Sequence, residues 1–191
     1  TNLTPAEIKE VEYTPEFFDV YGGHDGVSIR FARWEAVTKP FKGTVILLHG
    51  RAECIEKYYE TIGELRNRGF GVLTFDWRGQ GESSRLISDP RKGDVEHFND
   101  YLTDFETILT EIALPDCRGP YFILAHSTGA LVALLAGPAL ANRIQRMVLA
   151  SPLIRFGTIP VRQETLHRLL GAMFFTGLGQ MQLASGKTDP S

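Results

Sequence analysis

Ten residues, 121–130, constrain the fold of this chain more than any other stretch. The apolar run from Tyr121 to Ala125 is typical of a buried strand, and the chain then reaches Ser127, which has small residues two positions before and two positions after it. An apolar helical run, Leu131–Ala136, follows at once. The pattern predicts a strand, a sharp turn that carries Ser127, and a buried helix, which together make a nucleophile elbow. It therefore favours acyl transfer to a serine, a reaction that also needs a base.

Strand patterns and helix patterns alternate along the rest of the chain. Two apolar segments that flank the glycine-rich stretch 22–26 predict a hairpin. Continuous apolar runs predict buried strands, and apolar residues three or four positions apart predict helices. The predicted strands are 17–21, 27–36, 44–48, 71–75, 121–126 and 146–150, and the predicted helices are 53–67, 97–112 and the segment behind Ser127. This alternation predicts an α/β fold with a mostly parallel sheet and helices on both faces.

Reactive side chains follow several of these strands. They are His49 with Gly50 and Arg51, then Asp76, Ser127 and Ser151. Because ligand sites in such sheets lie beyond the carboxyl ends of the strands, we expect these residues to meet at one edge. That convergence supports a site more strongly than any single motif does.

Composition excludes several classes of protein. With 191 residues, 43% of them hydrophobic, and a net charge of −3, the chain can bury one core and shows no basic tract of the kind nucleic-acid binders carry. No apolar stretch reaches the ~20 residues of a membrane span, and residues 1–10 are too polar for a secretory signal. Cys54 and Cys117 fit no metal spacing and suggest two reduced thiols, although their pairing stays open. The sequence therefore predicts a soluble, cytoplasmic protein without a metal or cofactor.

The residues around Ser127 suggest where an oxyanion would bind. The helix that starts there directs its N-terminus at the serine, and the backbone N–H of Thr128 is placed to donate. A second donor should come from the loop after strand 44–48, where the N–H of Arg51 is the candidate. In that loop, Gly50 would permit the turn, His49 would hold it by hydrogen bonds, and Glu53 would favour the helix dipole. The alternative for Ser127 is a serine that only caps a helix.

Other motifs are assigned structural roles. The loop 76–83 resembles a phosphate loop superficially, but it lacks the glycine spacing and the Gly-Lys-Ser/Thr ending. We expect Gly79 and Gly81 to allow tight turns there, while Asp76 and Arg78 tie the loop. The remaining histidines, none of them in metal-ligand spacing, are interpreted as surface or packing residues: His24, His97, His126 and His167.

Several strings together resemble the α/β-hydrolase fold, and more narrowly the bacterial lysophospholipase and monoacylglycerol lipase branch. They are Leu48–Glu53, Asp76–Gly81, Arg85–Pro90, His97–Tyr101 and Ile123–Ser127, and the resemblance covers about residues 18–152. It implies Ser127 as nucleophile, the N–H groups of Arg51 and Thr128 as oxyanion hole, and a lipid-like ester substrate with an acyl chain. Small-for-small differences at Ala125 and Ala130 weaken it little.

The larger departure from the family lies after strand 146–150. In that family an acid and then a histidine follow the nucleophile, but this chain ends at Ser191. We expect residues 1–150 to form the N-terminal part of the core and 151–191 to begin a cap, although a helix packed on the core is an equal alternative. His167 and Asp189 are poorly placed for a triad. The apolar residues that suit a lid are Leu166, Leu169, Leu170, Met173, Phe174 and Phe175.

The leading hypothesis is therefore a serine hydrolase of carboxylic esters such as lysophospholipids or monoacylglycerols. The 191 residues would lack the triad acid and histidine, would be inactive alone, and would leave an apolar sheet edge open for a C-terminal segment of the same protein. Transient contact with a membrane surface fits a lipid substrate. Two alternatives remain open: a non-catalytic hydrolase-like binding domain, and a peptidase or small-ester hydrolase on the same fold.

Overall fold

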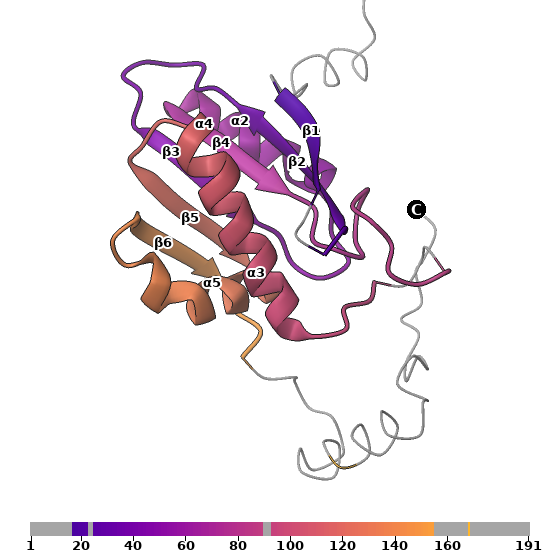
Figure 1. Ribbon diagram of the computed structural model, residues 1–191. Helices are drawn as coiled ribbons and strands as arrows, with labels where there is room; N and C mark the ends of the chain where they lie inside the picture. Colours follow the sequence, from indigo (N-terminus) through magenta and orange to yellow (C-terminus); the bar gives the residue numbers. More distant parts are fainter. Residues whose placement is uncertain (1–16, 23–24, 90–92, 155–167, 169–191) are drawn as a thin grey trace, which may run out of the picture. The chain divides into compact units, whose positions relative to one another are not determined.

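A six-stranded sheet forms the centre of the computed structural model, which describes residues 17–22, 25–89, 93–154 and 168 (Figure 1). The strand order is β1-β2-β4-β3-β5-β6. The strands are β1 (Phe17–Gly22), β2 (Ser28–Trp34), β3 (Gly43–Leu48), β4 (Phe70–Phe75), β5 (Tyr121–His126) and β6 (Ile144–Ala150). β1 pairs with β2 and β2 with β4 in antiparallel fashion, and all other pairs are parallel. The predicted hairpin and the mostly parallel α/β sheet are confirmed.

Helical segments connect the parallel strands. They are the 3₁₀ turn η1 (Ile55–Tyr58), α2 (Tyr59–Asn67), α3 (Phe98–Ile108), the π-helical turn η2 (Leu109–Ala113), α4 (Leu114–Asp116) and α5 (Ser127–Leu140). The predicted helix 53–67 thus begins at Ile55, and only as a 3₁₀ turn. The predicted helix 97–112 becomes irregular at Leu109 and runs into α4, where Pro115 has no N–H to donate to a helical ladder.

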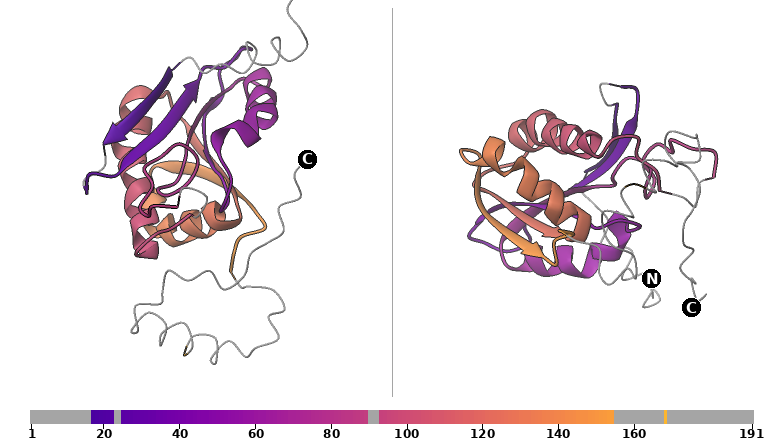
Figure 2. Two further views of the ribbon diagram at one scale, coloured as in Figure 1. Left: turned by 90° about the vertical axis from the view of Figure 1, so that its right-hand side faces the viewer. Right: turned by 90° about the horizontal axis from the view of Figure 1, so that it is seen from below.

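The sheet carries a separate apolar core on each face, because successive side chains of a strand point to opposite sides. On one face, Ile46, Leu48 and Leu73 pack with Phe105 of α3 and Val132 of α5. On the other face, alternate residues of the same strands pack with Ile55 and with Ile62 of α2. Figure 2 shows α2 on one side of the sheet and α3 with α5 on the other. Covering helices on both faces leave the carboxyl ends of the strands as the place for a site.

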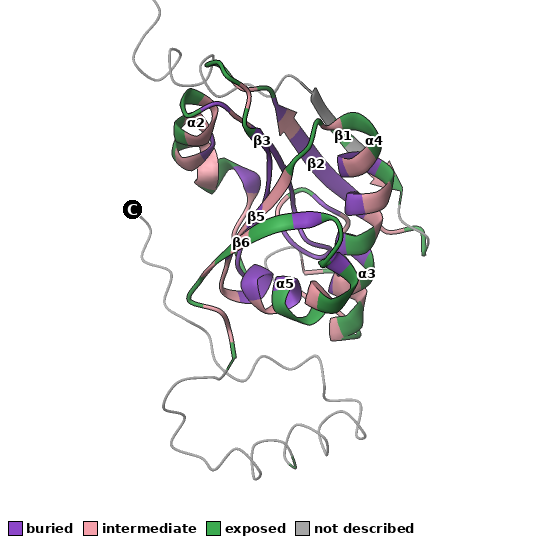
Figure 3. Cartoon of the chain, turned by 90° about the vertical axis from the view of Figure 1, so that its left-hand side faces the viewer, coloured by how far each residue is buried: buried purple, intermediate pink, exposed green. Residues whose placement is uncertain are grey.

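The second half of α5 is more exposed than its sequence predicts. An all-round apolar helix was expected to be buried, and residues such as Thr128, Ala130 and Val132 are. Leu134 and Leu135, however, are 43% and 52% exposed. The cause is position: α5 contacts β3, β5, β6 and α3 on one side, and no described residue covers the other side (Figure 3).

The chain divides into two compact units, residues 1–154 and residues 155–191. Apart from the exposed helical residue Arg168, the second unit lies outside the described residues, and so do all the apolar lid candidates named above. The same holds for His24, His167, Asp189 and the polar segment 1–10. The domain division at residue 150 therefore stays a prediction. Within the described ranges, no helix has both the length and the apolar character that crossing a bilayer requires.

Candidate active site

Ser127 is the first residue of α5 and follows β5 without an intervening loop. Its φ is +50°, a backbone conformation that residues other than glycine adopt at a cost of order 1 kcal/mol or more. Such strain persists only where the surroundings enforce it, and it concentrates at functional sites. The other two non-glycine residues with positive φ in the described ranges, Ala52 and Ser151, follow β3 and β6 at the same edge of the sheet. The predicted sharp turn at Ser127 is therefore confirmed.

Two glycines bring the end of β3 against this turn. A Cβ added to Gly129 would lie 2.7 Å from the carbonyl oxygen of His49, with the oxygen of Leu48 closer still. A Cβ added to Gly50 would lie 3.1 Å from the Cβ of Ser127. Gly50 does not have a positive φ, so its role differs from the predicted one: it allows a close approach rather than a turn. The loop that holds Arg51 consequently lies directly beside Ser127.

The two predicted oxyanion donors are both located at this junction. Thr128 is the second residue of α5, so its N–H has no acceptor within the helix, and the helix dipole favours negative charge there. The residue is buried, and its Oγ1 has no hydrogen-bond partner among the described residues. Arg51 lies between Gly50, whose N–H donates to Glu53 Oε2 at 2.7 Å, and Ala52, whose N–H donates to Gln80 Oε1 at 2.7 Å. The loop is thus held on both sides of Arg51.

Glu53 has a different role from the one predicted. Helix formation begins only at Ile55, and the Glu53 side chain, 7% exposed, turns back to the loop instead. It accepts hydrogen bonds from the Gly50 N–H, from Tyr58 Oη at 2.6 Å and from Lys57 Nζ, and His126 Nδ1 lies at 3.2 Å. Burial alone would raise the pKa of Glu53, but these donors outweigh it and hold the pKa at about 2. Glu53 is therefore a carboxylate that orders the loop.

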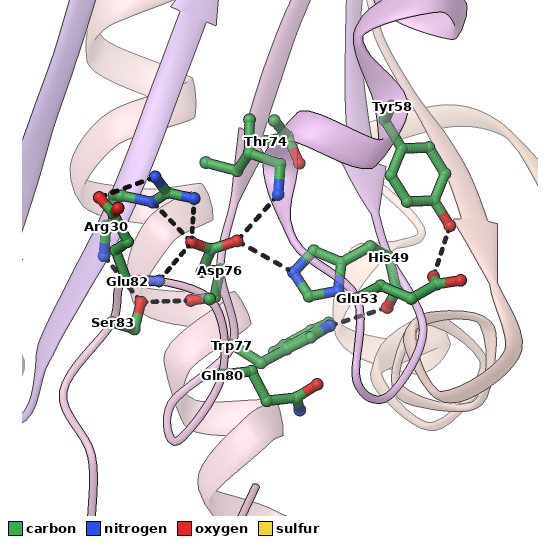
Figure 4. Close-up of polar contacts among 12 residues, drawn as sticks. Arg30, His49, Glu53, Tyr58, Thr74, Asp76, Trp77, Gln80, Glu82 and Ser83 are labelled. Atoms are coloured by element: carbon green, nitrogen blue, oxygen red, sulfur yellow. Dashed lines mark hydrogen bonds and ion pairs between the residues drawn. The ribbon is translucent and has the colours of Figure 1, made fainter. Parts of the chain in front are cut away.

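Asp76, at the end of β4, is the centre of a buried polar network (Figure 4). Its carboxylate accepts hydrogen bonds from Arg30 Nε at 2.5 Å and from the backbone N–H groups of Ile55 and Glu82 at 3.0 and 2.9 Å. The Nε2 of His49 lies 3.5 Å from its Oδ1. Burial opposes ionisation, yet the contacts with His49 and the Glu82 N–H and the charge of Arg30 keep the pKa of Asp76 below its usual range. Asp76 therefore joins β2, the segment after β3 and the loop after β4 as a carboxylate.

Arg30 was missed at the level of sequence. It occupies a buried position of β2, 3% exposed, where it pairs with Asp76 and with both oxygens of Glu56 at 2.8 and 2.9 Å. The sequence signal is weak, because Arg33 and Glu35 also lie in the predicted strand 27–36 and nothing in the pattern distinguishes Arg30 from them. Nothing in that run indicates which loop supplies its partners, because they come from positions 26 and 46 residues away.

The loop 76–83 has the structural role that the sequence predicts. Arg78 donates to both oxygens of Asp104 at 2.7 and 2.6 Å and to Asp25 at 2.7 Å. Gly79 and Gly81 have φ values of +74° and +51°, which glycine adopts readily. The prediction that two charged residues and two glycines shape this loop is confirmed.

No described residue supplies a base to Ser127. His126 directs its Nδ1 to Glu53, and His97 is exposed near Glu96. Between residues 17 and 154, outside the gaps, no histidine or carboxylate hydrogen-bonds to Ser127 Oγ, and no three side chains of the His, Cys, Asp or Glu type are grouped to hold a metal.

Cys54 and Cys117 are free thiols, as predicted, and burial raises the pKa of Cys117 to about 11.

The model of the family "Serine aminopeptidase, S33" matches residues 39–188. The chain belongs to this α/β-hydrolase family. Within the family it groups with the lysophospholipases and monoacylglycerol lipases. It is 37% identical over 115 residues to lysophospholipase L2 of Escherichia coli, covering 60% of this chain and 33% of the relative. It is 34% identical over 148 residues to a probable lysophospholipase L2 of Haemophilus influenzae, covering 73% and 46%.

Solved structures agree on the fold. A carboxyl esterase from Bacillus coagulans superposes with a TM-score of 0.68 at 21% identity, covering 88% of this chain and 53% of that one. A monoglyceride lipase from Saccharomyces cerevisiae gives 0.63 at 23% identity, covering 85% and 52%. The chain thus spans between a third and about half of the length of these relatives and solved structures.

Proposed function

We propose that Ser127 is the nucleophile of a carboxylic-ester hydrolase and that the N–H groups of Arg51 and Thr128 form its oxyanion hole. One observation carries this proposal: Ser127 has a strained φ of +50° at a strand-to-helix turn, with the Gly50–Arg51 loop against it. A serine that merely caps a helix has ordinary extended backbone and needs no loop beside it. The geometry supports a serine displayed for attack.

In the proposed reaction, Ser127 Oγ attacks the ester carbonyl and loses its proton to a base. The negative charge that develops on the carbonyl oxygen accepts hydrogen bonds from the two backbone N–H groups. The alcohol leaves with a proton, and water then hydrolyses the acyl-serine. Burial of Thr128 lowers the local dielectric, which strengthens the interaction of its N–H with the oxyanion.

The base and its orienting acid are proposed to come from a further C-terminal segment of the same protein. Two facts support this. The matched relatives are two to three times longer than the aligned part, and no described histidine reaches Ser127. Without those groups, the 191 residues would keep the oxyanion hole but lose most of the rate. Residues 151–191 would then begin a cap over the acyl chain.

The proposed substrate is a lysophospholipid or a monoacylglycerol, since the relatives carry these names. A substrate of this type resides in membranes or micelles, so transient contact with a membrane surface is part of the proposal. The family's own description, an aminopeptidase, makes a peptidase or small-ester hydrolase the second candidate. A third, a binding domain without catalysis, differs in predicting no covalent adduct.

The test is a reaction of the full-length protein with a fluorophosphonate, followed by peptide mass spectrometry. We expect one adduct, on Ser127, and none in Ser127→Ala. Ser151→Ala is the matched control, because Ser151 also has a positive φ after a strand at the same edge, and it should label normally. An adduct on another residue, or none, would contradict the assignment of Ser127 as the nucleophile. Turnover of a monoacylglycerol against an aminoacyl anilide then separates the lipase from the peptidase.

A further inference from the structure

Three successive N–H groups follow the strand β3, and two of them are occupied by side chains. The N–H of Gly50 donates to Glu53 Oε2, and the N–H of Ala52 donates to Gln80 Oε1, both at 2.7 Å. The N–H of Arg51, between them, is given no acceptor by any described residue. The loop is therefore built so that one donor remains for a ligand.

The carbonyl groups of the same loop are held too. The oxygen of His49 accepts from Trp77 Nε1 at 2.8 Å, and the oxygen of Gly50 lies 2.8 Å from His49 Nδ1, which must be the donor because a carbonyl only accepts. In a trans peptide the C=O and the next N–H point in opposite directions. Fixing the Gly50 oxygen against His49 therefore directs the Arg51 N–H to the other side of that peptide.

Gln80 lies in the loop after β4, and its side chain binds Ala52, the residue that follows Arg51. Its side chain is buried, 3% exposed, and its amide is bound at both ends: Nε2 donates to Tyr101 Oη at 3.2 Å, and Oε1 accepts from Ala52. Ala52 needs such a restraint, since its φ of +58° is strained and would relax if it were released. A relaxation at Ala52 would rotate the Arg51 peptide with it.

We propose that Gln80 is a positioning residue of the oxyanion hole, which holds Ala52 in its strained conformation and thereby aims the Arg51 N–H at the reacting carbonyl. This rests on the proposed function of Ser127. The glutamine itself touches no reacting atom. Its contribution appears only when the carbonyl oxygen gains charge, because the Arg51 N–H is then worth more than with the neutral ester.

The test uses the full-length protein with Gln80→Met, which keeps the side-chain volume and removes the acceptor. A misplaced donor costs up to about 100-fold in rate, so we expect kcat for a monoacylglycerol to fall by roughly 10- to 100-fold while KM stays within about twofold. The inhibition constant of a trifluoromethyl ketone, whose adduct carries the oxyanion, should rise by the same factor. The matched control is Tyr101→Phe, which removes the other partner of Gln80 and should stay within about twofold of wild type in kcat.

Amide hydrogen exchange supplies a readout that does not depend on catalysis. In wild type, the Ala52 amide should exchange slowly and the Arg51 amide quickly, and Gln80→Met should abolish the protection of Ala52. Equal exchange of the two amides in wild type would overturn the proposal. So would an unchanged kcat in Gln80→Met, an unchanged ketone affinity beside a reduced kcat, or equal losses in Gln80→Met and Tyr101→Phe. Absence of a Ser127 adduct in wild type would instead overturn the proposed function, and the oxyanion role of Gln80 with it. Protection of the Ala52 amide would even then show that Gln80 holds Ala52.

Discussion

The loops after β3 and β4 differ sharply from the outer pair formed by β6 and α5. In those loops, side chains such as His49, Asp76 and Gln80 are almost completely buried, and Asp76 and Gln80 bind neighbouring segments. In the outer pair, apolar side chains are exposed: Val148 of β6 is 62% exposed, and the two leucines of α5 are near half (Figure 3). In the first region most buried polar side chains have partners among the described residues, whereas the second has apolar surface that nothing described covers.

This difference separates the two halves of the proposed chemistry. The Arg51 side of the proposed oxyanion hole depends on β2, β3, β4 and the loops between them, all inside the described part of the chain. In the proposal, the base comes from a segment outside the described residues. β6 is the edge strand at which a longer chain could continue the sheet. We therefore expect substitutions in the first region to act on the 191-residue chain itself, and substitutions at the exposed apolar positions of the second region to act only when more protein is present.

Asp76→Ala should have the largest effect. It would leave the buried Arg30 with less compensation and two backbone N–H groups without their acceptor. Breaking a buried ion pair from one side costs about 3–5 kcal/mol, so we expect a loss of this size in the free energy of unfolding, measured in urea. Glu64→Ala is the control, since its pair with Arg68 is 61% exposed on both sides, and about 0.5 kcal/mol or less is expected. A loss below about 1 kcal/mol for Asp76→Ala would show that the Asp76 network contributes little to the stability of the fold.

Glu53→Gln should reduce the pH dependence of the free energy of unfolding below pH 4.5. The folded pKa of about 2 lies below the ordinary 4.5, so the carboxylate stabilises the fold fully above pH 4.5 and loses this contribution as the pH falls towards 2. The pKa shift corresponds to a stabilisation of roughly 3 kcal/mol at most, and Glu53→Gln lacks this stabilisation at every pH. Urea unfolding at pH 2.5, 4 and 7 measures the difference between the variant and wild type. The exposed Glu60→Gln is the control, and parallel profiles for Glu53→Gln and wild type would contradict the loop-ordering role.

Gly129→Ala tests the contact between α5 and the end of β3. The added methyl would meet the carbonyl oxygens of Leu48 and His49, so overpacking should cost about 1–3 kcal/mol and move Ser127 away from the loop. Gly137→Ala lies in the same helix with nothing within 4 Å of the new Cβ, and it should be neutral or stabilise by up to about 1 kcal/mol. Thermal unfolding compares the two. Equal effects would mean that the close approach of the helix does not matter.

The sequence predicts the parts of this molecule that depend on local pattern. The strand-turn-helix around Ser127, the hairpin and the glycine turns at Gly79 and Gly81 all follow from periodicity or from backbone freedom. It does not predict partners across the fold. Arg30, Glu53 and Gln80 each bind segments that become neighbours only when the sheet assembles, and the same side chains would look solvated in a sequence window. The exposure of α5 was missed for the same reason, since it depends on which segments of the fold pack against the helix.

Val148→Thr should have the smallest effect and examines the outer region directly. The substitution keeps shape and strand propensity and adds a hydroxyl, so at a 62% exposed position it should change the free energy of unfolding by about 0.5 kcal/mol or less. Val72→Thr is the matched change at a fully buried position of β4 and should cost about 1–3 kcal/mol, because its hydroxyl loses water. Repeating both in the full-length protein gives the decisive comparison. If a further segment covers β6, the cost of Val148→Thr should approach that of Val72→Thr; if it stays near zero in both contexts, the apolar surface of β6 is not where a longer chain packs.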